Sequence, residues 1–277
     1  MRVVILTNPQ SNQNALITKM AERVDVAAVV LSQNIPRKKP AFAKRIRSYA
    51  NAFAARSAGR ELLHAWQGML QRYEESFPAF TAAPIVKVEN INDDETRDAV
   101  SKYAPDLIVV SGTNLVGRKL IEHSKDFGGI VNLHTGVSPY VKGGPNCTNW
   151  CLAKAWFHLI GNTVMWLDAG VDSGALIATE RTPLDGSESL TDLQWKVMEH
   201  AHDLYVSVVE QHGQKMELPS VSQSGIADGT EFRSAEWNAR AMKSALSNFK
   251  TAYGDFFRNF EPENLPKEIK LLPLDRG

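Results

Sequence analysis

A side-chain amide and an imidazole stand two residues apart near the middle of the chain, and a carboxylate follows them. Asn132 and His134 come at the end of an apolar run that begins at residue 130, and Asp172 follows a second apolar run. Because residues two apart in a strand point to one face, both side chains would reach into one crevice. An amide donor, an imidazole and an acid together could polarise a carbonyl group and move a proton. Taken singly, the histidine and the aspartate would more often be ordinary loop and turn residues.

The residues that surround these three resemble a known family. Asn132-Leu133-His134 is followed by Pro139 and Gly143, then by Gly-Asn-Thr-Val-Met from residue 161, then by Asp168-Ala-Gly-Val-Asp172-Ser-Gly174. This order and spacing is similar to the signature of the 10-formyltetrahydrofolate-dependent formyltransferases. Members of that family act on glycinamide ribonucleotide, on methionyl-tRNA or on sugar nucleotides.

The resemblance implies an enzyme that moves a formyl group from 10-formyltetrahydrofolate, its co-substrate, to a primary amine. Attack by the amine creates a negatively charged oxygen, to which Asn132 and a protonated His134 could donate hydrogen bonds. Asp172 would raise the pKa of His134 and relay a proton through a water molecule. This scheme needs no covalent nucleophile, so Ser138 and Cys147 are not expected to act as one, and no metal is expected.

The resemblance also implies which residues bind the two substrates. The folate-binding candidates lie in two loops that follow strands, and they are Ser111, Gly112, Thr113 and Leu115, then Asp168, Ala169, Gly170 and Val171. The amine-binding candidates are Ser11, Asn12, Gly143 and Gly144. Ser11 and Asn12 lie in a segment similar to the phosphate loop of the glycinamide ribonucleotide enzymes. That loop has glycines where this chain has residues 8–10, so an ordinary helix cap and turn stays an alternative.

The elements that must position these side chains follow from the apolar runs. Residues 2–7 and 26–31 are typical of buried parallel strands on either side of a helix at 14–23, which is how a doubly wound sheet begins. We therefore expect an α/β, Rossmann-like, mostly parallel sheet with helices on both faces. The first turn lacks Gly-x-Gly-x-x-Gly, so nothing indicates a dinucleotide cofactor. Further strands are expected at 84–88, 106–113, 130–133, 163–167 and 174–182, and helices at 93–103, 115–123, 150–157 and 189–212.

Composition bounds the partners and the domain organisation. The 277 residues include 31 Lys+Arg and 31 Asp+Glu, so net charge does not point to a nucleic acid or a membrane. We expect a catalytic domain at 1–217 and a small C-terminal appendage at 218–277. The two cysteines are not spaced as zinc ligands, which favours a cytoplasmic protein. The basic segment 36–60 is expected to form a solvated helical hairpin or to dock an anionic substrate. The five histidines His64, His158, His200, His202 and His212 are expected on the surface.

Several functions stay open at this point. The first choice of acceptor is the amine of a sugar nucleotide, followed by another small amine such as glycinamide ribonucleotide. Methionyl-tRNA is third, because about sixty C-terminal residues are too few for the full second barrel of those enzymes. A 10-formyltetrahydrofolate hydrolase would use water in place of the amine, but the hydrolases carry an N-terminal regulatory domain and this chain begins at the first strand. A non-catalytic folate or nucleotide binder would not need the three polar residues. A homodimer is left open.

Overall fold

The computed structural model describes residues 1–35, 59–80, 82–144, 146–215 and 218–276. The basic segment expected at 36–60 therefore lies outside the described residues except for its last two positions. Arg60 begins a helix, α3, that continues to Ser76.

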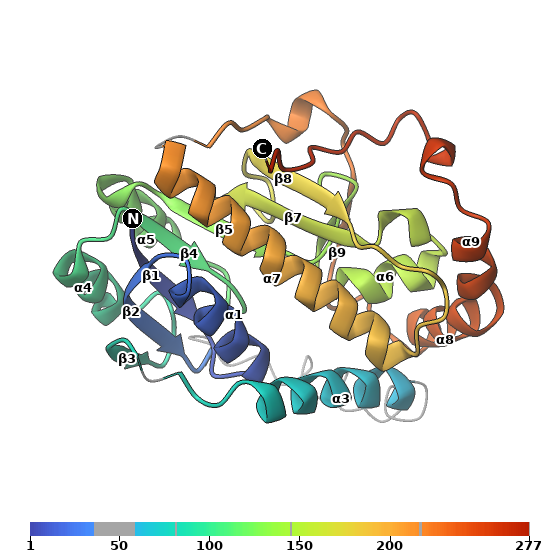
Figure 1. The fold of residues 1–277 in the computed structure, drawn as a ribbon, viewed down its shortest axis with the longest axis horizontal. Helices are drawn as coiled ribbons and strands as arrows, with labels where there is room; N and C mark the ends of the chain where they lie inside the picture. Colours follow the sequence, from blue (N-terminus) through green and yellow to red (C-terminus); the bar gives the residue numbers. More distant parts are fainter. Residues whose placement is uncertain (36–58, 81, 145, 216–217, 277) are drawn as a thin grey trace.

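Seven strands form one sheet in the order β3-β2-β1-β4-β5-β7-β8. The first four pairings in this order are parallel, and β7 is antiparallel to both of its neighbours. The expectation of a mostly parallel α/β sheet is confirmed (Figure 1). The strand order reverses between β1 and β4, and in such sheets ligands bind beyond the carboxyl ends of the strands at this point. The strands are β1 (Arg2–Thr7), β2 (Asp25–Ser32), β3 (Ile85–Val88), β4 (Leu107–Val110), β5 (Ile130–His134), β7 (Gly161–Trp166) and β8 (Leu176–Arg181).

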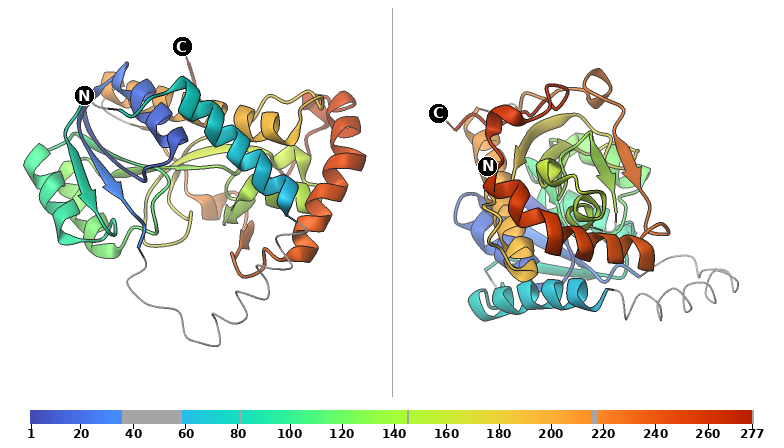
Figure 2. Two further views of the ribbon diagram at one scale, coloured as in Figure 1. Left: turned by 90° about the horizontal axis from the view of Figure 1, so that it is seen from below. Right: turned by 90° about the vertical axis from the view of Figure 1, so that its right-hand side faces the viewer.

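Helices cover both faces because the parallel strands are apolar on both sides. On β1, Val3 and Ile5 pack into a core with α1 (Ser11–Ala21) and α7 (Leu190–Lys215). Their neighbours Val4 and Leu6 pack on the opposite face with α4 (Asp94–Tyr103) and α5 (Arg118–Ser124). In Figure 1 α7 crosses the first face diagonally, and Figure 2 shows α1 and α3 together on the same side.

Helix α3 is anchored to the first face. The hydroxyl of the buried Tyr73 donates a hydrogen bond of 2.7 Å to Glu199 on α7, and Lys19 on α1 contacts the same carboxylate at 3.0 Å. Burial, followed by the charge of Glu199, raises the pKa of Tyr73 far above its usual range. Helix α3 is therefore a packed third helix of this layer.

The C-terminal residues pack on the strands and helices around residues 137–160. Strand β9 (Thr230–Phe232) pairs with β6 (Val141–Gly143) in a second, two-stranded parallel sheet. Helix α8 (Ala239–Asn248), a π-helical turn (Phe249–Tyr253) and α9 (Gly254–Arg258) share one hydrophobic cluster with α6 (Cys147–Lys154). The chain end then runs beside β8, where the backbone N–H of Thr179 donates to Leu272 at 2.8 Å. The boundary at 217/218 stays a prediction.

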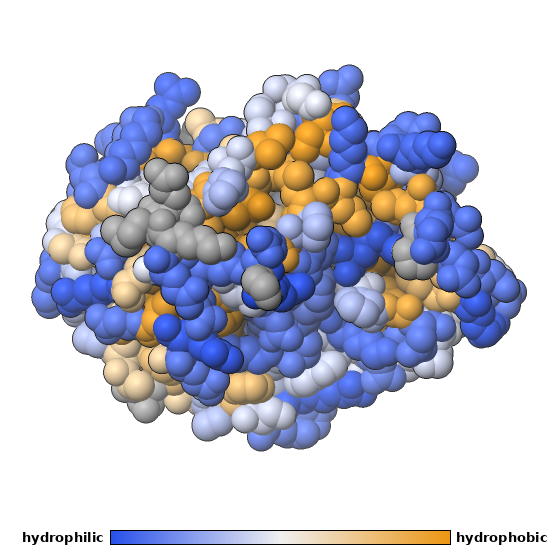
Figure 3. Space-filling view, turned by 45° about the horizontal axis from the view of Figure 1, so that its top comes forward, coloured by the Kyte–Doolittle hydropathy of each residue, from blue (hydrophilic) through white to orange (hydrophobic). Residues whose placement is uncertain are grey.

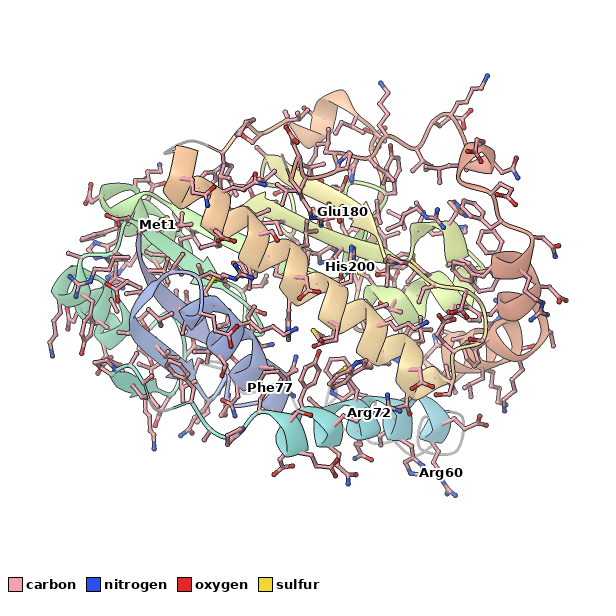
Figure 4. All side chains as sticks on the ribbon, viewed as in Figure 1. Met1, Arg60, Arg72, Phe77, Glu180 and His200 are labelled. Atoms are coloured by element: carbon pink, nitrogen blue, oxygen red, sulfur yellow. The ribbon has the colours of Figure 1, made fainter. Side chains whose placement is uncertain are left out.

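Two local expectations are wrong. Between the strand expected at 130–133 and the helix expected at 150–157, the sequence indicates only a loop, yet this stretch contains β6 and the start of α6. Strand β6 forms by pairing with a strand almost ninety residues later in the chain. His202 is fully buried beside Tyr73, at 5.6 Å between ring centroids, since α7 is covered by the sheet and by α3. His200 is also inside, bonded to Glu180 at 3.1 Å between β8 and α7 (Figure 4).

Figure 3 shows mainly hydrophilic residues on the face it presents, with the largest group of hydrophobic residues in its upper half. Within the described ranges, no helix combines the length and the apolar character that crossing a bilayer requires.

Tyr205 on α7 ties the two central strands together just before their ends. Its hydroxyl accepts from the backbone N–H of Val110 at 3.0 Å and lies 2.7 Å from the carbonyl oxygen of Val131. We expect Tyr205→Phe to lower the free energy of unfolding by about 1–3 kcal/mol, because two buried backbone groups lose this partner. Urea unfolding measures the loss, with Tyr103→Phe at the end of α4 as the control. A loss no larger than that of the control would contradict this account.

Candidate active site

A cavity of about 380 Å³ lies beyond the carboxyl ends of β1, β4 and β5, at the reversal of strand order. This is where ligands bind in open α/β sheets. Most of the residues selected from the sequence line it, namely Asn12, Ser111, Gly112, Thr113, Leu115, Asn132, His134, Gly143, Asp168, Gly170 and Asp172.

His134 is the last residue of β5, and both of its ring nitrogens face oxygen atoms. Nδ1 lies 3.4 Å from Oδ2 of Asp172, and Nε2 lies 3.0 Å from the carbonyl oxygen of Val141. A carboxylate and a carbonyl oxygen can only accept hydrogen bonds, so both nitrogens must carry a proton to satisfy them. The geometry therefore favours the positively charged imidazolium.

The electrostatics of the pair agree with this protonation state. The His134 and Asp172 side chains are only 9% and 17% exposed, so water screens their interaction weakly. Burial by itself lowers the pKa of His134, but the negative charge of Asp172, followed by the contact with Cys147, outweighs burial and raises that pKa to about 10. His134 is thus a cation at neutral pH.

The loop at 168–174 presents the Asp172 carboxylate to His134. The same carboxylate accepts a hydrogen bond of 2.9 Å from the backbone N–H of Gly143. The backbone of Asp172 has φ of +46°, in the left-handed region that aspartate tolerates better than most residues. Asp168 folds the start of the loop by accepting from Gly170 N–H at 2.9 Å and from the Ser173 hydroxyl at 2.6 Å.

Asn132 shares its strand face with His134, as expected, because the two are separated by one residue of β5. It lies opposite Met165 of the antiparallel strand β7. Its side-chain amide lines the cavity and has no hydrogen-bond partner among the residues that the structure describes. The amide is therefore available to a ligand.

Four of the residues selected from the sequence do not line the cavity. The Ser11 hydroxyl donates to the carbonyl oxygen of Leu70 at 2.6 Å and so holds α1 against α3. Gly144 donates its backbone N–H to Phe232 at 3.0 Å. Ala169 and Val171 alternate with Gly170 and Asp172 in their loop, and only the latter two reach the cavity.

Other lining residues were not selected as ligand-binding candidates. Asn8, Gln10 and Gln13 come from the turn after β1 and the start of α1, and Trp66 comes from α3. The helical spacing of Trp66 in the sequence is the same for a core residue as for a ligand contact, so it favours the commoner core role. The available signal was the carboxamide-rich turn itself. No lysine or arginine lines the cavity within the described part of the chain.

The lining fits a flat heterocycle with polar edges. Val110, Leu115, Val116 and Leu167 supply apolar surface, and Thr113 and Asn114 supply polar groups beside it. The described residues hold no group of three or more His, Cys, Asp or Glu side chains placed to bind a metal.

The family is decided by comparison with known proteins. The profile of the family described as Formyl transferase matches residues 1–209, which is most of the chain. The chain belongs to the formyl transferase family. The resemblance drawn from the residues around Asn132, His134 and Asp172 is thereby confirmed at the level of the family.

The similar proteins cover different lengths. A methionyl-tRNA formyltransferase of Finegoldia magna is 27% identical over 46% of this chain and 40% of its own length. The methionyl-tRNA formyltransferase of Chlorobium chlorochromatii is 24% identical over 76% of this chain and 58% of its own length. The chain thus spans about half the length of these relatives. Two solved structures share the fold. A 4-N formyltransferase from Francisella tularensis has a TM-score of 0.55 and 14% sequence identity, over 89% of this chain and 87% of its own. A sugar N-formyltransferase from Shewanella has a TM-score of 0.53 and 10% identity, over 90% of this chain and 87% of its own.

Proposed function

We propose that this formyl transferase family member transfers a formyl group from 10-formyltetrahydrofolate to a primary amine carried by a sugar nucleotide. The observation that supports the reaction best is His134, held between Asp172 and Val141 while the unpaired amide of Asn132 points from the same strand face into the cavity. The family membership supports the same reaction class. The free cysteines Cys147 and Cys151 suit a cytoplasmic enzyme, which we also propose.

The formyl oxygen gains negative charge when the amine nitrogen bonds to the formyl carbon. The Asn132 amide can donate to that oxygen, and the His134 cation lies beside it. His134 can add a second hydrogen bond by exchanging its bond to Val141 for one to the substrate. A preorganised donor of this kind contributes about 2.7–4 kcal/mol to the transition state.

Protons must move as the nitrogen–carbon bond of the donor breaks. The attacking amine loses one proton, and the folate nitrogen that leaves gains one. Asp172 is the carboxylate that contacts His134, so it can accept the first proton through a water molecule while keeping the imidazolium in place. The proton reaches the leaving nitrogen by the same route in reverse.

The acceptor would bind on the side of the cavity formed by the turn after β1. Asn8, Gln10 and Gln13 offer both donors and acceptors to hydroxyl groups, and Trp66 offers an aromatic surface to a sugar ring. No described lining residue is a lysine or arginine, so this side of the cavity suits the neutral hydroxyl groups of the amino sugar, and the diphosphate of the sugar nucleotide would lie outside it.

Incubation with 10-formyltetrahydrofolate and a panel of amines tests the function. The panel contains amino-sugar nucleotides, glycinamide ribonucleotide and methionyl-tRNA, and mass spectrometry detects the formylated product. We expect transfer to an amino-sugar nucleotide. Transfer to another amine of the panel would show that this amine, and not a sugar nucleotide, is the acceptor. Folate turnover that needs no amine would replace the transferase with a hydrolase, and the absence of any turnover would leave a binding protein.

Trp66 tests the acceptor side by itself. Trp66→Ala should raise the KM for the amine about tenfold through the loss of stacking, with little change in the KM for 10-formyltetrahydrofolate. Trp66→Phe keeps an aromatic face and should stay close to wild type. Steady-state kinetics with each substrate varied in turn measures both constants. An unchanged amine KM in Trp66→Ala would remove Trp66 from the acceptor site.

A further inference from the structure

Gln223 comes from a part of the chain beyond the 1–209 region matched by the family, yet its side chain reaches the catalytic loop. It begins a short 3-10 turn (Gln223–Gly225) and is 5% exposed. Its Nε2 donates to the carbonyl oxygen of Asp172 at 2.8 Å and to that of Gly174 at 2.7 Å. One amide group therefore joins two points of the loop that carries the acid.

The position of the Asp172 carboxylate depends on its backbone. With φ of +46°, Asp172 adopts a conformation that is unfavourable for a residue with a side chain unless its surroundings hold it. The carbonyl of this same residue receives the Gln223 hydrogen bond. A small rotation of the backbone would swing the carboxylate away from Nδ1 of His134, which it contacts at 3.4 Å.

The segment that carries Gln223 is itself anchored next to the site. Val221 and Leu176 exchange two backbone hydrogen bonds of 2.8 Å each, which fix the entry of the segment against β8. A few residues later β9 pairs with β6, and Gly143 of β6 donates to the Asp172 carboxylate. The C-terminal segment thus supports Asp172 from two sides.

We propose that Gln223 is a positioning residue that holds the loop of Asp172 so that the carboxylate stays against His134. Its role requires a donor, because both partners are carbonyl oxygens. Its own Oε1 is buried without a hydrogen-bond partner among the described residues, so the side chain is placed for its N–H groups. The catalytic consequence rests on the proposed function, but the effect on His134 does not.

Gln223→Met tests the proposal because methionine fills a similar volume and has no N–H donor. The His134 ring proton is followed by NMR across a pH titration, and formyl transfer is assayed in parallel. The pKa of His134, raised to about 10 by its neighbours, should fall when Asp172 is no longer held in place. We expect kcat to fall about tenfold and both KM values to change less than about threefold.

Gln211→Met is the matched control, since the Gln211 amide on α7 also donates to a backbone carbonyl, that of Asp275, away from the cavity. It should change neither His134 nor kcat. If Gln223→Met does not fold, Gln223→Asn keeps the amide but is one methylene too short to reach both carbonyls, and it should show the same changes. A folded variant with an unaltered His134 titration would overturn the proposal. Inactive wild-type protein would count against the function alone, because the titration needs no substrate.

Discussion

His134→Ala slows formyl transfer by about 10²–10⁴-fold, the effect expected when a group that handles charge and protons in the transition state is removed. The loss should appear in kcat, because the imidazolium acts on charge that develops only after the amine attacks. Steady-state kinetics measures it, with His64→Ala on the exposed side of α3 as the control. Circular dichroism and thermal unfolding confirm that the variant is folded. A folded His134→Ala protein with a rate within a few-fold of wild type would remove His134 from catalysis.

The pH dependence of the same reaction follows from the environment of His134. Burial lowers its pKa, but Asp172 and Cys147 outweigh burial and raise the pKa to about 10. The active form is the cation, so the rate should hold through neutral pH and decline as pH rises through that value. Asp172→Asn removes the main negative charge and should move the decline to lower pH. If the rate of Asp172→Asn declines at the same pH as that of the wild type, Asp172 does not raise the pKa of His134.

Asn132→Ala lowers kcat by about 10²–10³-fold, since one donor to a developing oxyanion contributes about 2.7–4 kcal/mol. The amide has no other partner among the described residues, so its removal leaves no buried group unsatisfied and should cost little stability. The KM values should change much less than kcat, because the bond strengthens as the oxygen becomes charged.

Asn259→Ala serves as the control for Asn132→Ala, because Asn259 is an exposed asparagine in the C-terminal part of the chain. Combining Asn132→Ala with His134→Ala shows whether the two donors act on one oxygen. If they do, the double variant loses less than the product of the single losses. If the two losses multiply, Asn132 and His134 act on different atoms of the substrate.

The C-terminal segment matters for how this site is understood. The three proposed catalytic residues lie inside the region matched by the family, whereas Gln223 and β9 lie after it. The loop of Asp172 therefore depends on residues that comparison with the family would not select. Variants in this segment can change catalysis without touching a substrate.

The strand that ends at His134 and the loop that leads to Asp172 could be interpreted from the sequence because the information there is local. Alternation in a strand places Asn132 and His134 on one face, and continuous apolar runs predict buried parallel strands. These two rules, together with the resemblance, predicted the α/β fold, the proposed catalytic trio and the proposed folate-side loops. The structure brings Asn132, His134 and Asp172 together in one cavity.

Only the tertiary structure decided the rest, because it depends on pairings between distant segments. β6 forms against β9, Trp66 reaches the cavity because α3 packs on α1 and α7, and Gln223 meets Asp172 from 51 positions later in the chain. No periodicity in the sequence records such contacts. The contact between the carbonyl oxygen of Val141 and Nε2 of His134, which requires a proton on that nitrogen, also joins residues that no sequence pattern brings together.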